Sequence, residues 1–291
     1  MKSNATLAAL LENFFTRRLM SQRQASPHTI SSYRDTFRLL LLFAERRLHK
    51  PPTRLAFEEI DAPLIAAFLD DLEKSRGIAI RSRNLRLTAI RSFFRYAAYE
   101  EPSHASQIQR VLAIPCKRHT RALVHFLNRP EVDALLAAPD QETWFGRRDH
   151  ALLLVAVQTG LRLSELTSLQ RRDVSLGTGA HVRCVGKGRK ERCTPLTKIT
   201  VAVLKAWLRE PTRRNAETLF PSASGGRLSP DSVADLLTKH VTRACHACPS
   251  LRNKRVTPHV LRHTMAMELL QAGIDRAVIA LWFVVPGFHP A

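Results

Sequence analysis

The first 100 residues carry the apolar spacing of α-helices and no other regular pattern. In PHTISSYRDTFRLLLLFAERRL, residues 27–48, apolar side chains recur every three or four positions and therefore line one face of a helix. Asp61 and Pro63 predict the start of another helix, and Gly77 predicts its end. We expect this part of the chain to fold from helices alone.

A third helix is predicted in IRSRNLRLTAIRSFFRYAAYE, residues 80–100. Its apolar residues share one side, and four arginines point largely away from that side. These arginines are Arg83, Arg86, Arg91 and Arg95. We expect them to form a basic surface.

The net charge of the whole chain indicates which kind of partner such a basic surface would bind. Lys and Arg number 45 against 25 Asp and Glu, a formal net charge of +20 that is spread along the sequence. This imbalance predicts a polyanionic partner, with nucleic acid well ahead of a membrane surface. No apolar run approaches the roughly 20 residues of a membrane helix, and the N-terminus lacks the pattern of a secretory signal. We expect a cytoplasmic protein with no membrane partner.

A linker is predicted where the helical spacing is lost. Residues 101–131 contain several prolines and many basic residues, and Asn128 with Pro130 then starts a new helix. We expect a first domain at 1–110, a linker at 111–127 and a second domain at 128–291.

The second domain mixes helices with a small sheet. DHALLLVAVQTG is apolar nearly all round and predicts a buried helix that ends at Gly160. AHVRCVGKGRKERCTPL, residues 180–196, has two short strand-like runs around a turn, which is typical of a β-hairpin. Further helices are expected at 199–209, 230–245, 257–272 and 275–282. The predicted fold is mainly α, with a small antiparallel β-sheet in the second domain.

Three segments of the second domain carry basic residues suited to an anion. They are TGLRLSEL with Arg162, VGKGRKER with Lys187, and TPHVLRHT with His259 and Arg262. In the last segment a Thr-Pro pair starts a helix, so His259 and Arg262 project from one face of its first turn. That end of a helix favours anions.

These segments, in this order, resemble the motifs of the tyrosine recombinase (phage integrase) family, most closely its Xer-like and transposon-associated members. SPHTISSYRDTFRLLLLFA and LRLTAIRSFFRYA also resemble the family's helical core-binding, SAM-like domain. The similarity covers roughly residues 5–282. It implies a helical N-terminal DNA-binding domain followed by an α+β catalytic domain. It also implies double-stranded DNA as partner and four protomers on two sites as the active form.

The resemblance further implies roles for individual residues. Arg162 and Arg262 would bind the nonbridging oxygens of the scissile phosphate, because a planar guanidinium meets two such oxygens at once. Lys187 would protonate the departing 5′ oxygen, and His259 would assist with phosphate contact and proton transfer. Lys187 and Arg189 would contact DNA together with the arginines of the basic helix. No metal or cofactor is implied, since the arginines stabilise the charge that a metal would.

Each of these residues also has an ordinary structural interpretation. Arg162 and Glu165 could form a helix-start ion pair, Lys187 could be a solvated hairpin residue, and His259 could be a plain first-turn residue. The role of His263 could be packing. Their joint occurrence, in order and in matching local sequence, favours the recombinase interpretation.

A zinc site is a weaker alternative. Cys245 and Cys248 form a single Cys-x-x-Cys pair, with His240 and His246 nearby. Without a second matching pair, reduced cysteines at a helix end are the expected state.

The family pattern breaks near the end of the sequence. FVV, residues 283–285, stands where the resemblance calls for L-G-H, so Val285 occupies the position of the His, and His289 lies too late to replace it. The only tyrosines are Tyr33, Tyr96 and Tyr99, all in the first domain. We therefore expect a chain truncated at its C-terminus, by frameshift, insertion junction or premature end, without a nucleophile and deficient in cleavage. We also expect an exposed apolar patch at residues 281–283.

Two functional hypotheses follow. The chain is either a recombination or integration protein by ancestry, or a DNA-binding remnant that competes with an intact recombinase. An intact relative could also act as its partner and supply the tyrosine.

Overall fold

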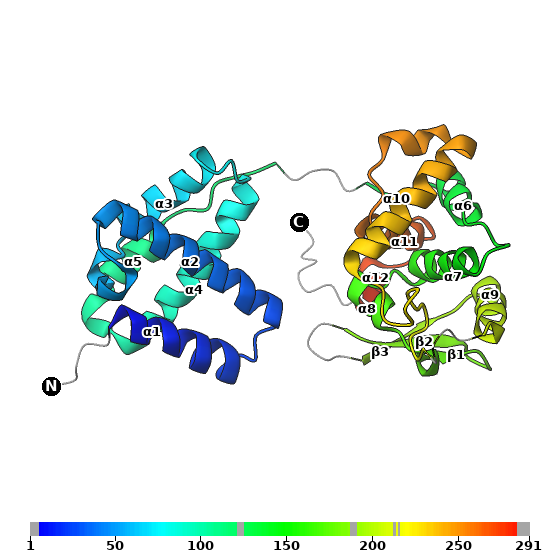
Figure 1. The fold of residues 1–291 in the computed structure, drawn as a ribbon, viewed down its shortest axis with the longest axis horizontal. Coiled ribbons are helices and arrows are strands. Elements are labelled where there is room, and N and C mark those ends of the chain that lie inside the picture. The colour runs from blue at the N-terminus through cyan, green and yellow to red at the C-terminus, as the bar shows by residue number, and fades with distance from the viewer. Residues whose placement is uncertain (1–5, 121–124, 187–190, 212–213, 215, 284–291) are drawn as a thin grey trace. The chain divides into compact units, whose positions relative to one another are not determined.

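The computed structural model describes residues 6–120, 125–186, 191–211, 214 and 216–283 (Figure 1). The chain divides into two units, Met1–Arg121 and Ala122–Ala291. The division falls inside the predicted linker. Each unit has its own hydrophobic core.

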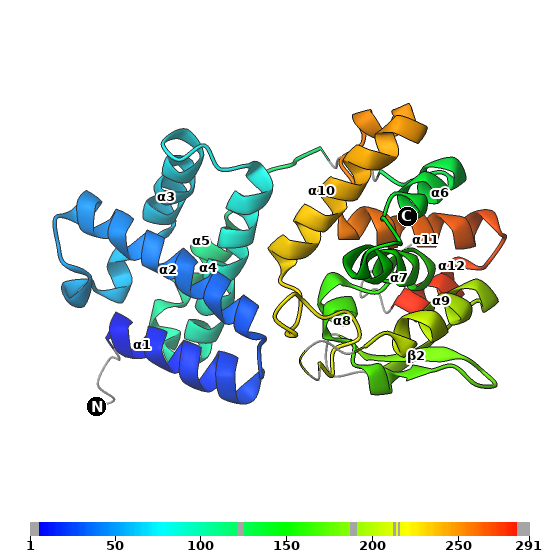
Figure 2. The same ribbon diagram turned by 45° about the vertical axis from the view of Figure 1, so that its right-hand side comes forward.

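Helices alone build the described part of the first unit, as the apolar spacing predicts (Figures 1 and 2). Its α-helices are α1 (Leu7–Asn13), α2 (Pro27–Leu48), α3 (Ala62–Lys74), α4 (Ile80–Glu100) and α5 (Ala105–Ala113). Between and beside them lie the π-helical η1 (Phe14–Gln22) and the 3₁₀ turns η2 (Pro52–Arg54), η3 (Phe57–Glu59) and η4 (Pro102–His104).

Side-chain caps fix where two of these helices begin. The Ser26 hydroxyl accepts a hydrogen bond from the Thr29 backbone N–H at the start of α2. The Asp61 carboxylate accepts one from the Leu64 N–H at the start of α3, at 2.8 Å. Each cap satisfies a backbone donor that the first helical turn leaves without a partner.

Aromatic rings form much of the first core. The Phe37 and Phe93 ring centroids lie 5.3 Å apart, and Phe14 lies 5.5 Å from Phe93 in the same edge-to-face manner. These contacts join η1, α2 and α4. Rings of this size bury large apolar areas and dominate the stability of a small helical unit.

The second unit combines helices with a three-stranded antiparallel sheet of order β1-β2-β3. Its strands are β1 (Val174–Ser175), β2 (His181–Val185) and β3 (Glu191–Pro195). Its α-helices are α6 (Arg129–Ala137), α7 (Trp144–Thr159), α8 (Leu163–Ser168), α9 (Lys198–Arg209), α10 (Pro230–Ala247), α11 (Pro258–Gln271) and α12 (Arg276–Phe283). The 3₁₀ turns are η5 (Arg171–Asp173) and η7 (Pro249–Asn253).

Helix α7 forms the centre of this unit, where it packs against α6, α9 and α11 (Figure 2). Ala151, Leu153 and Val155 are fully buried. The helix ends at Gly160, which adopts the left-handed conformation with φ +58°. A side chain would be strained there, so glycine ends the helix at low cost.

The structure confirms most of the elements expected from the sequence. The β2–β3 hairpin and α9 to α12 all occur, with boundaries that differ by a few residues. Several short elements were not predicted, among them α5, which lies where the helical spacing fails, α8, and the two-residue strand β1. No helix in the described ranges is long and apolar enough to cross a membrane.

Candidate active site

Arg162 is held at the turn between α7 and α8. Two residues after Gly160, it has the extended conformation of an N-cap residue, with φ −66° and ψ 152°. The Glu165 carboxylate accepts from the Arg162 backbone N–H at 2.8 Å and from its Nη1 at 2.9 Å. The helix-start ion pair expected from TGLRLSEL is therefore present, and it orients the Arg162 guanidinium.

Arg262 reaches the same region from the first turns of α11. Thr257 caps this helix by accepting from the Val260 N–H, and Pro258 follows it, as predicted. The Arg262 side chain is buried; its Nη1 donates to the Gly160 carbonyl and its Nη2 donates to the Phe283 carbonyl at 2.6 Å. The Phe283 ring centroid lies 4.6 Å from the guanidinium carbon.

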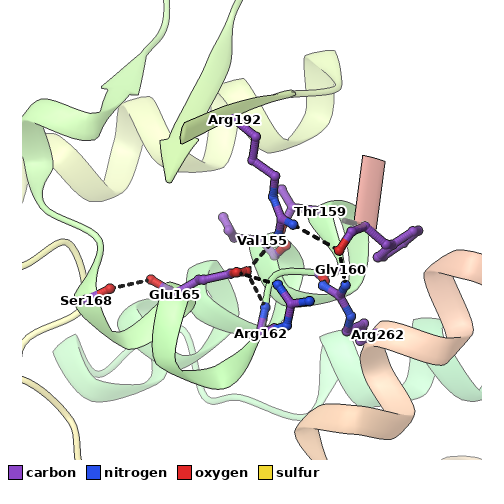
Figure 3. A network of polar contacts seen from close by, with 9 residues as sticks. Val155, Thr159, Gly160, Arg162, Glu165, Ser168, Arg192 and Arg262 are labelled. Atoms are coloured by element: carbon purple, nitrogen blue, oxygen red, sulfur yellow. Dashed lines mark hydrogen bonds and ion pairs between the residues drawn. The ribbon is translucent and has the colours of Figure 1, made fainter. Parts of the chain in front are cut away.

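A third arginine, Arg192 on β3, enters the same site. Its Nη2 pairs with Glu165 Oε2 at 2.6 Å, and its Nη1 donates to the Phe283 carbonyl at 3.2 Å. Figure 3 shows Arg162, Arg192 and Arg262 around Glu165. We call these four residues the arginine site.

Positive charge dominates the arginine site. Burial, and then the neighbouring Arg162 and Arg192, lower the pKa of Arg262 to about 10. The guanidinium is still protonated at neutral pH. Buried cations that repel one another are stabilised by an anion placed between them. The geometry therefore suits the binding of an oxyanion such as phosphate.

Sequence reasoning did not single out Arg192, although the hairpin contains a usable signal. Arg192 pairs across the sheet with Cys184, whose side chain is buried. Directly opposed residues of an antiparallel pair point to the same face, so Arg192 must also point inward. The signal becomes visible only once the strand register is known.

The two histidines of TPHVLRHT lie on the exposed side of α11 near the arginine site. His259 and His263 are both exposed. Partial burial, and then His259 and Arg262, lower the pKa of His263. His259 and Arg262 stand three residues apart in the first turns of α11, and a shared ligand for them stays a prediction.

Lys187 and Arg189 lie outside the described residues. The strands β2 and β3 that flank them form the predicted hairpin.

The basic helix α4 differs from the expectation at Arg83. This side chain is buried and pairs with Glu73 at 3.4 Å, while its Nη1 donates to the Pro115 carbonyl. Glu73 on α3 and the segment after α5 cover it, and neither is visible in the helical spacing of α4 alone. Arg83 therefore does not belong to an exposed basic surface.

The other three arginines of α4 remain at least partly accessible. Arg86 and Arg91 are half-buried, and Arg91 donates to the Ile114 carbonyl. Arg95 is exposed.

The residues considered for zinc have other contacts. His240 Nε2 lies 2.8 Å from Asp149 Oδ2, and both side chains are buried. Cys248 Sγ lies 3.3 Å from the Ser250 hydroxyl. Within the described ranges, no three His, Cys, Asp or Glu side chains are grouped to hold a metal ion.

We expected residues 281–283 to form an exposed apolar patch, and for Phe283 this expectation is wrong. Only 3% of Phe283 is exposed, because its ring packs on Arg262 and Gly160. A Cβ added to Gly160 would lie 2.2 Å from Phe283 Cε1, so the glycine also provides the space for the ring.

Comparison with known proteins decides the family. The model of the phage integrase family matches residues 125–282, and that of the phage integrase N-terminal SAM-like domain matches residues 13–101. The chain belongs to the phage integrase family of tyrosine recombinases. A putative integrase/recombinase, y4rC, from Sinorhizobium fredii (strain NBRC 101917 / NGR234) is 72% identical over 97% of this chain and 85% of its own length.

More distant members of the tyrosine recombinases share both units. A tyrosine recombinase XerC from Pelotomaculum thermopropionicum (strain DSM 13744 / JCM 10971 / SI) is 33% identical, over 91% of this chain and 86% of the relative. Among solved structures, the Tn1549 transposon integrase in complex with a circular intermediate DNA gives a TM-score of 0.70 at 13% identity, covering 98% of this chain and 96% of that one. At this identity the likeness shows the shared fold.

Proposed function

We propose that this tyrosine recombinase family member binds duplex DNA and holds one phosphodiester in the arginine site. The observation that carries the proposal is the convergence of Arg162 and Arg262. They come from α8 and α11, about 100 residues apart in sequence, yet Arg262 donates to the Gly160 carbonyl beside Arg162. A net charge of +20 supplies the attraction for a polyanion.

The chemical reason is the charge that develops on a phosphodiester during exchange. The pentavalent transition state loads negative charge on the nonbridging oxygens, and guanidinium groups that are already oriented stabilise it without reorganisation. Glu165 orients Arg162, and the Gly160 carbonyl orients Arg262, before any DNA arrives. Removing one such donor typically costs about 100-fold to 1,000-fold in rate.

Two further residues have proposed roles in this exchange. Lys187 would protonate the 5′ oxygen as it leaves phosphorus, and His259 would contact the phosphate and assist proton transfer. We also propose that Arg189 and the accessible Arg86, Arg91 and Arg95 of α4 contact backbone phosphates. Such contacts fix the position of DNA without reading its sequence.

We further propose that the 291-residue chain does not form a covalent bond with DNA by itself. Family chemistry requires a tyrosine hydroxyl to attack phosphorus, and residues 122–291 contain no tyrosine. Tyr33 stacks on Phe14 with ring centroids 6.4 Å apart, and Tyr96 is buried in the first core. Tyr99 is exposed but lies on α4 of the first unit. In this proposal the chain acts in recombination as a DNA-binding partner of an intact relative or as its competitor.

The test uses duplexes selected with the full chain from a random-sequence library. A nick is placed near the phosphate protected in footprinting, so that any covalent product is trapped, and products are separated on a denaturing gel. We expect bound duplex without a covalent adduct. An adduct that survives denaturation would overturn the cleavage-deficient proposal, and failure to select any duplex would overturn the DNA-binding proposal.

A further inference from the structure

Arg192 is oriented inward by the sheet. It stands opposite Cys184 in the β2–β3 register, and only 9% of its side chain is exposed. An arginine buried to this degree needs acceptors for its five N–H donors.

The acceptors that Arg192 finds leave one part of the guanidinium unsatisfied. Nη2 pairs with Glu165 Oε2 at 2.6 Å, and Nη1 donates to the Phe283 carbonyl at 3.2 Å. Its buried Nε has no hydrogen-bond partner within the described part of the chain. Most buried polar groups are paired, so this donor is available to a ligand that enters the arginine site.

Arg192 shares its carbonyl acceptor with Arg262. The Phe283 oxygen accepts from Arg262 Nη2 at 2.6 Å and from Arg192 Nη1 at 3.2 Å. Two guanidinium groups thus converge on one oxygen atom. A neutral carbonyl oxygen offsets little of the charge of two guanidinium groups. A phosphate oxygen at the same position would carry negative charge and offset more of it.

The net charge of the arginine site also favours a bound phosphate. The four residues hold three guanidinium groups and one carboxylate, which leaves a surplus of +2 (3 − 1); Glu165 pairs with Arg162 and Arg192, whereas Arg262 donates to backbone carbonyls. Burial, and then the neighbouring Arg162 and Arg192, lower the pKa of Arg262. A phosphodiester that gains charge during exchange would offset this surplus.

We propose that Arg192 is a third phosphate-binding arginine, and that a nonbridging phosphate oxygen replaces the Phe283 carbonyl oxygen between Arg192 and Arg262. The proposal rests on the DNA-binding function proposed above. The planar guanidinium of Arg192 can bind Glu165 with one nitrogen and the phosphate with the others. A lysine ammonium does not have donors in these fixed directions. The last turn of α12 then gives up its contact with the two arginines when DNA binds.

The experiment measures binding of the full chain to a duplex selected with that chain, over a range of salt concentrations. The variants are Arg192→Gln, Arg192→Lys, Arg262→Gln and the double Gln variant. The matched control is Arg147→Gln. Arg147 also pairs with a glutamate, Glu210, but lies near the start of α7, about 20 Å along the helix from Gly160.

We expect Arg192→Gln to weaken binding by about 10-fold to 100-fold, the usual effect of losing a charged hydrogen bond. The slope of log affinity against log salt should fall by about 0.9, because one phosphate contact is lost. Arg192→Lys should recover only part of the affinity. The double variant should lose less than the product of the two single losses, because both arginines bind one oxygen.

A purely structural role for Arg192 gives a different result. Arg192→Gln would then lower the urea midpoint, while the folded variant would keep the affinity and salt slope of Arg147→Gln. That result would overturn the inference and leave the proposed function standing. If the unmodified chain selects no duplex at all, the proposed function fails instead.

Discussion

Replacing Glu165 with glutamine tests whether one buried carboxylate holds the arginine site together. Its side chain is 3% exposed and accepts from Arg162 and Arg192. Breaking a buried ion pair by removing one partner typically costs about 3–5 kcal/mol. The pair with Arg192 is buried on both sides, whereas the Arg162 side chain is 25% exposed, so solvent screens that pair. Because glutamine keeps one acceptor oxygen, we expect a loss of about 3 kcal/mol in the free energy of unfolding.

Tryptophan fluorescence during urea unfolding measures this loss in the second unit alone. All three tryptophans, Trp144, Trp207 and Trp282, lie in residues 122–291. The control is Glu210→Gln, which breaks the more exposed pair with Arg147 and should cost much less, because solvent screens that pair. A Glu165→Gln loss no larger than the control would refute the argument that this carboxylate offsets the buried guanidinium charges.

The same variant has a second measurable consequence. Neutralising Glu165 raises the surplus charge of the four residues from +2 to +3, since only the arginines remain charged. Inorganic phosphate should then raise the unfolding midpoint of the variant more than that of the unmodified chain. Equal stabilisation of both proteins would show that phosphate binds elsewhere.

Three further predictions concern other buried groups and pH. Thr264→Val should cost about 1–3 kcal/mol by urea unfolding, because the Thr264 hydroxyl accepts from the buried Leu127 N–H at 2.9 Å and that donor would lose its partner. Asp149→Asn should cost about 3 kcal/mol in the same assay, because it leaves the buried Arg148 without its carboxylate; a loss below about 1 kcal/mol would contradict this. His263 has a folded-state pKa below its usual value of 6.5, so the unfolded chain takes up the proton first. Stability should therefore fall as pH drops from above 6.5 through the folded pKa, and urea midpoints should show a smaller fall in His263→Gln.

The sequence allowed the two-unit plan and most helices to be predicted because those features are local. Apolar spacing, the Thr257 cap and the Gly160 stop all act within a few residues. Through the family resemblance, the basic segments also predict that Arg162 and Arg262 bind one phosphate, which stays a prediction. The structure adds that the Gly160 carbonyl, two residues before Arg162, accepts a hydrogen bond from Arg262.

The features that the sequence could not give depend on contacts between distant segments. Arg83 has the spacing of a surface residue on α4, yet Glu73 of another helix buries it in an ion pair. Arg192 has the appearance of a solvated hairpin residue until the strand register turns it inward. Phe283 was expected to be exposed. Its ring instead packs on the guanidinium of Arg262, a residue of α11. In each case a contact with another helix or strand decides the environment.

The most direct test of the central claim is the structure of the full chain bound to a duplex selected with it. We predict a DNA phosphate between Arg162 and Arg262, with Arg192 on the same group and the Phe283 carbonyl displaced from both Arg192 and Arg262. If DNA is bound while Arg262 still donates to the Gly160 and Phe283 carbonyls and no phosphate reaches the arginine site, the account is contradicted.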